Sequence, residues 1–286
     1  MILLTGAAGK TGRAVSQALV EQGQSVRAFV HRPAQRQPLL ELGVQEVFVG
    51  DLRDGNALRQ AVAGVRAIYH ICPNVHPDEV AIGRDLIAAA RAAEVAHFVY
   101  HSVLHPQTET MPHHWNKLRV EELLLGSGLP FTILQPTVYM QNLLAGWQSI
   151  VEEGIYTIPY PVTCRLSLID LADVGAAAAQ VLTTPGHLYA TYELAGTEPL
   201  AQSEVATILS TGLGRPVEAK TLALAEWERN ARAAGMGDYA VDTLRKMFRY
   251  YARFGLAGNP SILRWLLGRA PRTLPEFVQS TVAAGD

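Results

Sequence analysis

The stretch Thr5-Gly6-Ala7-Ala8-Gly9-Lys10-Thr11-Gly12 decides the fold. It follows an apolar run at residues 2–5 and opens a segment of helical spacing at residues 10–22. Glycines spaced in this way form a variant of the dinucleotide fingerprint, in which they allow a tight turn, close approach to a pyrophosphate, and close packing of helix on strand. The helix N-terminus then presents free N–H groups to the phosphates. An ordinary strand–helix loop is the alternative, but the strand–turn–helix context favours a nucleotide site.

The first half of the chain alternates between two periodicities. Short apolar runs rich in β-forming residues lie at residues 2–5, 25–30, 46–49, 67–71, 97–102 and 131–134. Segments of helical spacing lie between them at residues 10–22, 57–62, 78–93 and 116–125. Strands that alternate with helices of this length predict a parallel sheet covered on both faces. The predicted fold is therefore α/β, a Rossmann-type doubly wound parallel sheet with a smaller, mostly helical C-terminal substrate portion.

The pattern changes after Pro136. We expect a helix at residues 139–151, a loop at residues 156–161, a helix near residues 170–183, a strand near residues 189–194 and a helix near residues 202–213. From residue 225 onward the chain is expected to be mostly helical. This predicts a nucleotide-binding domain over residues 1–150, to which residues 165–195 return. A smaller substrate or lid portion would take residues 196–286, interleaved with residues 139–164.

Composition excludes several classes of protein. The chain has 286 residues, a formal net charge of −2, 49% hydrophobic residues and 17% charged residues, so a disordered chain is excluded. A basic face for nucleic acid or for a membrane surface is not expected. Two cysteines cannot build a disulfide framework, which favours a reducing compartment. With no apolar run long enough to span a membrane and no basic stretch typical of a signal peptide, a cytoplasmic location is expected.

The end of the second predicted strand indicates which nicotinamide cofactor is bound. An NAD-selective site places an acidic residue there to hold the adenosine ribose, whereas this chain has Arg32, whose planar guanidinium suits a 2′-phosphate. Lys10 could add a second positive charge, so NADP(H) is predicted, although Arg32 could also be a solvated residue after a strand. Asp51 could accept from the adenine amino group, or could be a turn residue. The predicted cofactor-binding residues are Gly6, Ala8, Gly9, Lys10, Thr11, Gly12, Arg32, Asp51, Leu52 and Lys117.

The chemistry is expected where the later strands end, because ligands of doubly wound sheets bind beyond the carboxyl ends of the strands. His113 and Lys117 lie four residues apart and would share one face of a helix. A lysine there can bond the nicotinamide ribose, and a histidine can transfer a proton near neutral pH. Alternatively, His113 begins a helix and Lys117 is solvated, and the spacing does not decide between these two interpretations.

Two other kinds of site are not supported. Five histidines lie between residues 97 and 114, but His97 and His101 would be separated by roughly 13 Å on a strand, so no metal site is predicted. The chain has no G-x-S-x-G motif, so Ser102 is not supported as a hydrolase nucleophile.

Several segments together resemble the NmrA-like branch of the atypical short-chain dehydrogenases/reductases. They are the 5–12 loop, His31-Arg32-Pro33, Gly50-Asp51, Tyr100-His101-Ser102-Val103, His113-x-x-x-Lys117-x-x-x-Glu121, and residues 130–142, 167–175 and 192–196. The resemblance covers residues 1 to about 220 and thins to residues 267–273 and the final helix. It implies a domain that binds NADP(H) and a smaller portion that closes over the nicotinamide. The family includes NADPH-dependent reductases of quinones, dyes and other small unsaturated compounds, and also members that act as redox sensors without turnover.

Two functions follow from the resemblance. In the first, an NADPH-dependent reductase delivers hydride to a small, largely apolar quinone, enone or carbonyl compound, with Lys117, His113 and Ser102 as catalytic candidates. Ser102 would bond a carbonyl oxygen, as the superfamily serine does, and His113, a water or Lys117 would supply the proton. Candidate walls of the substrate pocket, or equally core residues, are Trp115, Tyr139, Met140, Asn142 and Tyr160.

The second function is a non-catalytic NADP(H)-binding sensor or regulatory protein. It follows from one departure from the superfamily, because His113 stands where the usual Tyr-x-x-x-Lys motif has tyrosine. An isomerase or dehydratase that holds its cofactor tightly is a third interpretation. The partner expected is a small molecule, with no direct nucleic-acid or membrane partner, and the chain is expected to be a monomer or a homodimer. The aromatic residues after residue 225 could pack in the core, line the pocket or form a homodimer face.

Overall fold

The computed structural model describes residues 1–285. The chain divides into two compact units. Unit 1 comprises Met1–Thr108, His114–Pro136 and Leu171–Tyr192, and unit 2 comprises Glu109–His113, Thr137–Asp170 and Glu193–Asp286. Each unit is therefore built from segments that are distant in the sequence.

Unit 1 is organised around a seven-stranded sheet of order β11-β6-β5-β4-β1-β2-β3. The strands are β1 (Ile2–Thr5), β2 (Val26–Val30), β3 (Glu46–Val49), β4 (Ala67–His70), β5 (His97–His101), β6 (Phe131–Pro136) and β11 (Ala190–Leu194). The pairs β1–β2, β1–β4, β2–β3, β4–β5 and β5–β6 are all parallel. The strand order reverses between β1 and β4, the switch point where doubly wound sheets bind ligands. The predicted fold class is confirmed.

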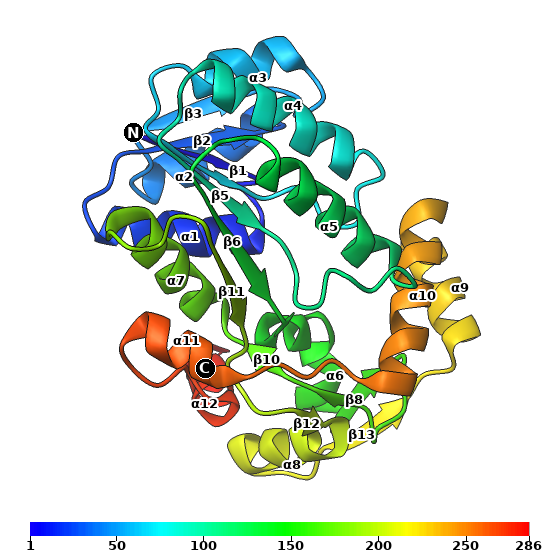
Figure 1. Cartoon of the computed structure of the whole chain (residues 1–286). Coiled ribbons are helices and arrows are strands. Elements are labelled where there is room, and N and C mark those ends of the chain that lie inside the picture. The colour runs from blue at the N-terminus through cyan, green and yellow to red at the C-terminus, as the bar shows by residue number, and fades with distance from the viewer. Residues whose placement is uncertain (286) are drawn as a thin grey trace. The chain divides into compact units, whose positions relative to one another are not determined.

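Helices cover both faces of this sheet, as Figure 1 shows. On one face lie α1 (Lys10–Glu21) and α7 (Leu171–Thr183), which pack on each other. On the other face lie α3 (Gly55–Val62), α4 (Glu79–Ala92) and α5 (Pro112–Leu125), whose apolar side chains form one buried cluster with the strands. The short helices η1 (Pro33–Gln35) and α2 (Arg36–Glu41) connect β2 to β3. Burial on both faces explains why the strands read as continuous apolar runs.

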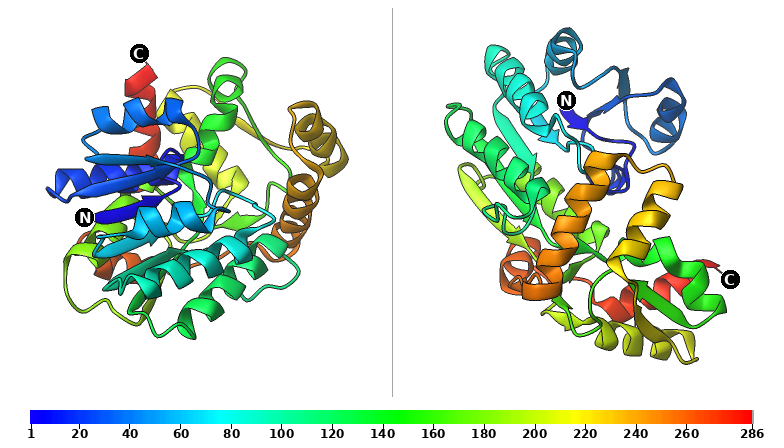
Figure 2. Two further views of the ribbon diagram at one scale, coloured as in Figure 1. Left: turned by 90° about the horizontal axis from the view of Figure 1, so that it is seen from above. Right: turned by 90° about the vertical axis from the view of Figure 1, so that its right-hand side faces the viewer.

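Unit 2 holds three two-stranded sheets and most of the later helices. Its pairs are β7 (Val138–Tyr139) with β10 (Leu168–Ile169), β9 (Arg165–Leu166) with β12 (Leu200–Ala201), and β8 (Ile155–Ile158) with β13 (Glu218–Thr221). Its helices, apart from the first residues of α5, are η2 (Met140–Gly146), α6 (Trp147–Glu152), α8 (Gln202–Leu213), α9 (Leu224–Ala233), α10 (Asp238–Phe254), α11 (Pro260–Leu267) and α12 (Leu274–Gly285). Figure 2 shows α9 and α10 side by side. The rings of Trp227 on α9 and Phe248 on α10 pack edge to face with their centroids 4.9 Å apart.

Three predictions of local structure were wrong. Residues 156–161 were expected to form a loop, but Tyr156 and Ile158 are buried residues of β8, and its partner strand β13 is distant in the sequence. The helix expected from residue 139 is instead the end of β7, a 3₁₀ segment and then the short α6. The helix expected from residue 116 begins four residues earlier, at Pro112, because proline is well tolerated in the first turn of a helix.

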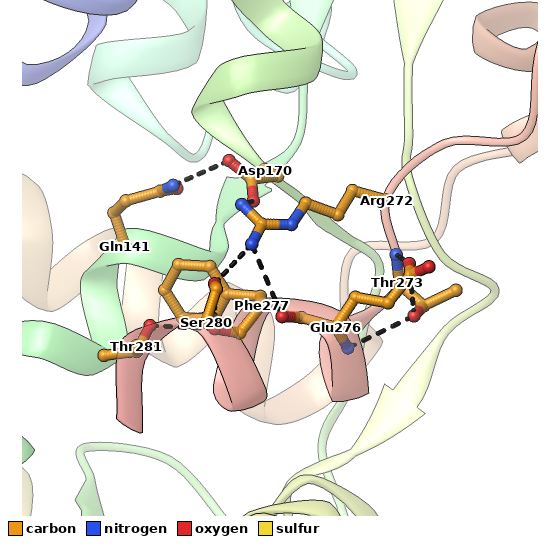
Figure 3. A network of polar contacts seen from close by, with 8 residues as sticks. All are labelled: Gln141, Asp170, Arg272, Thr273, Glu276, Phe277, Ser280 and Thr281. Atoms are coloured by element: carbon orange, nitrogen blue, oxygen red, sulfur yellow. Dashed lines mark hydrogen bonds and ion pairs between the residues drawn. The ribbon is translucent and has the colours of Figure 1, made fainter. Parts of the chain in front are cut away.

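A polar network around the buried carboxylate of Asp170 joins separate segments of unit 2 (Figure 3). Arg272 Nη1 lies 2.8 Å from Asp170 Oδ2, and Gln141 Nε2 donates to Oδ1 at 2.8 Å. The other terminal nitrogen of Arg272 contacts Ser280 Oγ and donates to the carbonyl of Glu276, both on α12. Asp170 therefore links η2, through Gln141, to the segment that enters α12.

Candidate nucleotide and active site

A pocket of about 460 Å³ lies in unit 1 where β1, β2, β3 and β4 end. Its lining residues come from the end of β2, from the four loops that follow these strands, from η1 and from the start of α4: Gly6, Ala8, Gly9, Phe29, Val30, His31, Gln35, Gly50, Asp51, Leu52, Arg53, Pro73, His76 and Ile82. The volume falls within the usual range for small-molecule and cofactor sites. The pocket occupies the crevice beside the switch point, where a nucleotide is expected.

The glycine loop shapes the first wall of this pocket. Gly6 adopts φ +64°, and a Cβ there would lie 2.9 Å from the carbonyl oxygen of Ile71. A Cβ on Gly12 would lie 2.6 Å from Ala7 Cα, so a larger residue would push α1 away from the loop. No side chain caps the start of α1 at Gly9, which leaves the first N–H groups of this helix available to an anion. The close backbone and the uncapped start of α1 are features expected of a pyrophosphate site.

The structure gathers only part of the predicted cofactor set around the pocket. Five of those residues line it: Gly6, Ala8, Gly9, Asp51 and Leu52. Within residues 1–285, the lining leaves out Lys10, Thr11, Gly12, Arg32 and Lys117. Arg32 is exposed just beyond β2. Its backbone N–H donates to Gln35 Oε1, and this hydrogen bond caps the N-terminus of η1. The predicted roles of these residues toward NADP(H) stay predictions.

Asp51 and Arg53 form a charged pair at the end of β3. Arg53 donates to Asp51 through its backbone N–H at 2.9 Å and through Nη2 at 2.7 Å. The side-chain hydrogen bond from Arg53 holds the pKa of the Asp51 carboxyl well below its usual range, so Asp51 is an acceptor only. Arg53 was not predicted as a site residue, although its place two residues after Asp51 put it on the same loop.

Lys117 is buried among polar groups where β5 ends. Its side chain comes from α5, and it is only 5% exposed. Nζ lies 2.7 Å from Glu79 Oε1 on α4, and it donates to the carbonyl oxygen of His101 at 3.1 Å. It also lies 5.4 Å from the centre of the Tyr100 ring. The interpretation of Lys117 as a solvated residue is therefore excluded. Its role as a site residue stays a prediction.

Two other groups near Lys117, His70 and Tyr100, are held in their neutral forms by burial. Burial lowers the pKa of the His70 imidazole to about 3, and the charge of Lys117 adds to this effect. Burial raises the pKa of the Tyr100 phenol well above its usual value, and Glu79 raises it further. The His70 ring shares a hydrogen bond of 2.8 Å with Thr5 Oγ1, and Thr5 Oγ1 also accepts from the backbone N–H of Ile71. This contact ties the last residue of β1, just before the glycine loop, to β4.

Ser102 belongs to a second buried group, just beyond Lys117's contact at His101. Its hydroxyl donates to Glu121 Oε1, which also accepts from Gln135 Nε2 at 2.9 Å. Burial raises the pKa of the Glu121 carboxyl. A serine whose proton is given to Glu121 must release that bond before it can donate to a carbonyl oxygen.

The remaining predicted residues are divided between the two units. His113 opens α5 one turn before Lys117 and is half-buried, while the next residue, His114, is buried with Nδ1 3.2 Å from the carbonyl of His105. Trp115 is half-buried on the same helix. The candidate pocket walls in unit 2 are Tyr139 on β7, Met140 buried in that unit's apolar core, Asn142 exposed on η2, and Tyr160 with its ring against Phe248 and Tyr251. Asn142 lines a smaller pocket of about 250 Å³ within unit 2.

Comparison with known proteins identifies the family. A family model described as the NmrA-like family matches residues 1–281. The chain belongs to the NmrA-like family. It is 34% identical to an NAD(P)H azoreductase of Xenophilus azovorans over 99% of both chains. It is 30% identical to quinone oxidoreductase 2 of Escherichia coli over 97% of both chains.

A solved structure agrees with this assignment. The crystal structure of an NADPH-dependent quinone oxidoreductase from Escherichia coli, complexed with NADPH, superposes with a TM-score of 0.86. The superposition covers 99% of this NmrA-like chain and 100% of that chain, at 29% sequence identity. The resemblance inferred from the motifs is confirmed, and it extends beyond residue 220 to nearly the whole chain.

The described part of this NmrA-like protein adds two plain observations. No helix within residues 1–285 is long and apolar enough to cross a membrane. Within the same residues, no cluster of histidine, cysteine, aspartate and glutamate could hold a metal ion.

Proposed function

We propose that this protein is an NADPH-dependent reductase that reduces a small, largely apolar quinone, enone or carbonyl compound. The observation that carries the proposal is the pocket beside the switch point, with a glycine loop in which a side chain at Gly6 or Gly12 would collide with the backbone. Its NmrA-like relatives include an NAD(P)H azoreductase and an NADPH-dependent quinone oxidoreductase, which supports the same class of reaction. When bound, NADPH supplies the hydride, and the protein orients it and excludes water.

The residues of this chain fit the adenosine and pyrophosphate part of NADPH. The loop from Gly6 to Gly9 and the N-terminus of α1 would bind the pyrophosphate through backbone N–H groups. Asp51, held ionised by Arg53, would accept a hydrogen bond from the adenine amino group. Arg32 would bind the 2′-phosphate, because a guanidinium forms strong paired hydrogen bonds to phosphate oxygens.

The residues at the end of β5 would handle the nicotinamide end and the acceptor. Lys117 would bond the nicotinamide ribose and place a positive charge near the acceptor, where negative charge develops during reduction. His113, whose residue type titrates near neutral pH, or a water would supply the proton. Ser102 would bond the acceptor only after its hydroxyl leaves Glu121, so we assign it the lesser role.

A turnover assay tests the proposal. Purified protein is mixed with NADPH and a panel of quinones, enones and carbonyl compounds, and the loss of nicotinamide absorbance is followed. We expect turnover with at least one acceptor, and at least a roughly tenfold lower kcat/KM for Lys117→Ala. Arg119→Ala is the matched control, because Arg119 is an exposed cation on the same helix. Tight NADPH binding with no turnover across the panel would refute the reductase and favour the redox sensor.

A further inference from the structure

The contacts of Lys117 fix the orientation of its ammonium group. An ammonium has three N–H donors, and here one points to Glu79 and one to the carbonyl of His101. Both acceptors are buried and belong to separate elements, α4 and β5. These two bonds fix the direction of the third N–H, whereas a solvated lysine would rotate freely.

Glu79 is itself held by its surroundings. It is 1% exposed and lies in the first turn of α4, where the helix dipole favours a negative charge. The Tyr100 hydroxyl donates to Oε1 at 3.1 Å, on the same oxygen that Lys117 contacts. The preceding loop carries Pro73 and His76, which line the nucleotide pocket. The carboxylate is therefore held by its helix and by a buried phenol, three residues after His76 of the pocket lining.

Four other titratable groups near Lys117 are buried. They are His70 on β4, Cys72 just after it, Tyr100 on β5 and Glu121 on α5. Burial lowers the pKa of His70 and raises the pKa values of Cys72, Tyr100 and Glu121, so each is pushed toward its neutral form. Taking an ammonium out of water is unfavourable unless an opposite charge compensates it. Glu79 is the group placed to provide that compensation.

Building on the function proposed above, we infer that Glu79 is a positioning residue that keeps Lys117 charged and directs its third N–H to the nicotinamide ribose. Lys117 then serves as a permanent cation. If Lys117 gave its proton to the acceptor, Glu79 would remain as a buried carboxylate without its cation, which opposes that transfer. The proton that completes reduction therefore comes from His113 or from water, and Lys117 is excluded as its source.

The test measures NADPH binding by isothermal titration calorimetry from about pH 7 to about pH 9. The proteins compared are the wild type, Glu79→Gln, Glu79→Asp and the control Glu122→Gln, which removes an exposed carboxylate from α5. Without Glu79 the buried amine favours its neutral form as the pH rises, so the affinity of Glu79→Gln relative to wild type should fall roughly tenfold or more across this range. Glu79→Asp keeps the charge, so its ratio to wild type should stay level with pH even if its affinity is lower. Glu122→Gln should match wild type throughout.

The outcomes separate the two proposals. If the wild type binds NADPH and the ratio for Glu79→Gln stays level with pH, the role of Glu79 is refuted while the proposed function stands. If the wild type does not bind NADPH at any pH, the proposed function is refuted. A ¹⁵N NMR measurement of Lys117 Nζ in the NADPH-bound wild type keeps the inference testable if Glu79→Gln does not fold. We expect a charged ammonium at about pH 9, and a neutral amine would overturn the inference.

Discussion

Replacing Arg272 with methionine tests whether the network around Asp170 stabilises unit 2. The substitution keeps most of the length of the side chain but removes the guanidinium that lies 2.8 Å from Asp170 and contacts α12 at Ser280. Asp170 keeps its hydrogen bond from Gln141 but loses its cation (Figure 3). Because Asp170 is only 1% exposed, its carboxylate gains little solvation to offset the loss.

The expected magnitude follows from the burial of the two partners. Removing one partner of a fully buried ion pair costs about 3–5 kcal/mol. The Arg272 side chain is 32% exposed, so solvent already screens part of the attraction and the expected cost is about 2–3 kcal/mol. For a chain of this size, that loss lowers the melting temperature by roughly 5–10 °C.

Thermal denaturation at pH 7, followed by circular dichroism, measures this effect. The control is Arg264→Met, which removes an exposed arginine from α11 and should leave the melting temperature nearly unchanged. If Arg272→Met melted within about 1 °C of the control, the network would contribute nothing measurable to the free energy of unfolding, and the reasoning from burial would be wrong.

Three further predictions concern unit 1, which contains the nucleotide pocket. Gly12→Ala should weaken NADPH binding at least tenfold in calorimetric titration, because its Cβ would collide with the loop, whereas Gly237→Ala has open space and should have no effect. Burial lowers the pKa of His97 to about 4. Between about pH 6.5 and pH 4 the imidazole is therefore protonated in the unfolded chain and neutral in the folded chain, so the free energy of unfolding should fall as the pH drops through this range. In urea denaturation, His97→Gln should remove roughly 1.4 kcal/mol per pH unit of that loss, and an unchanged pH slope would contradict this. Arg32→Asp should lower the preference for NADPH over NADH by roughly ten- to a hundredfold, while Arg91→Asp, at the far end of α4, should preserve it; equal ratios for both variants would contradict the assignment.

The sheet of unit 1 could be predicted from the sequence because its signals are local. Every strand from β1 to β6 is a short apolar run between turn residues, and helical spacing predicted α1, α3, α4 and α5. The short η1 and α2, between β2 and β3, were not predicted. The strand β8 was missed for a physical reason. Its buried Tyr156 and Ile158 alternate with exposed Thr157 as a strand requires, but proline follows at once and the partner β13 lies about sixty residues later. Such a short strand is stabilised by its distant partner, which local spacing does not reveal.

The sequence predicted site residues that lie together in one loop, and it missed contacts between residues that are distant in the sequence. The glycine loop and Asp51 could be predicted because each directly follows an apolar strand. Residues of this loop and Asp51 line the pocket in the structure. Glu79 carries none, because its contact with Lys117 joins residues 38 apart and depends on how α4 and α5 pack on the sheet. The bond between Ser102 and Glu121 is of the same kind, and it changes the role expected of the serine.

The central claim is that hydride leaves NADPH while the cofactor is bound to this protein. A single-turnover experiment tests it, in which protein loaded with NADPH is mixed rapidly with a quinone and the nicotinamide absorbance is recorded. The proposed function predicts a single exponential loss of that absorbance, which becomes slower when the transferred hydrogen of NADPH is deuterium. Stable absorbance over many minutes with the cofactor still bound, for every quinone, enone and carbonyl compound tried, would contradict it.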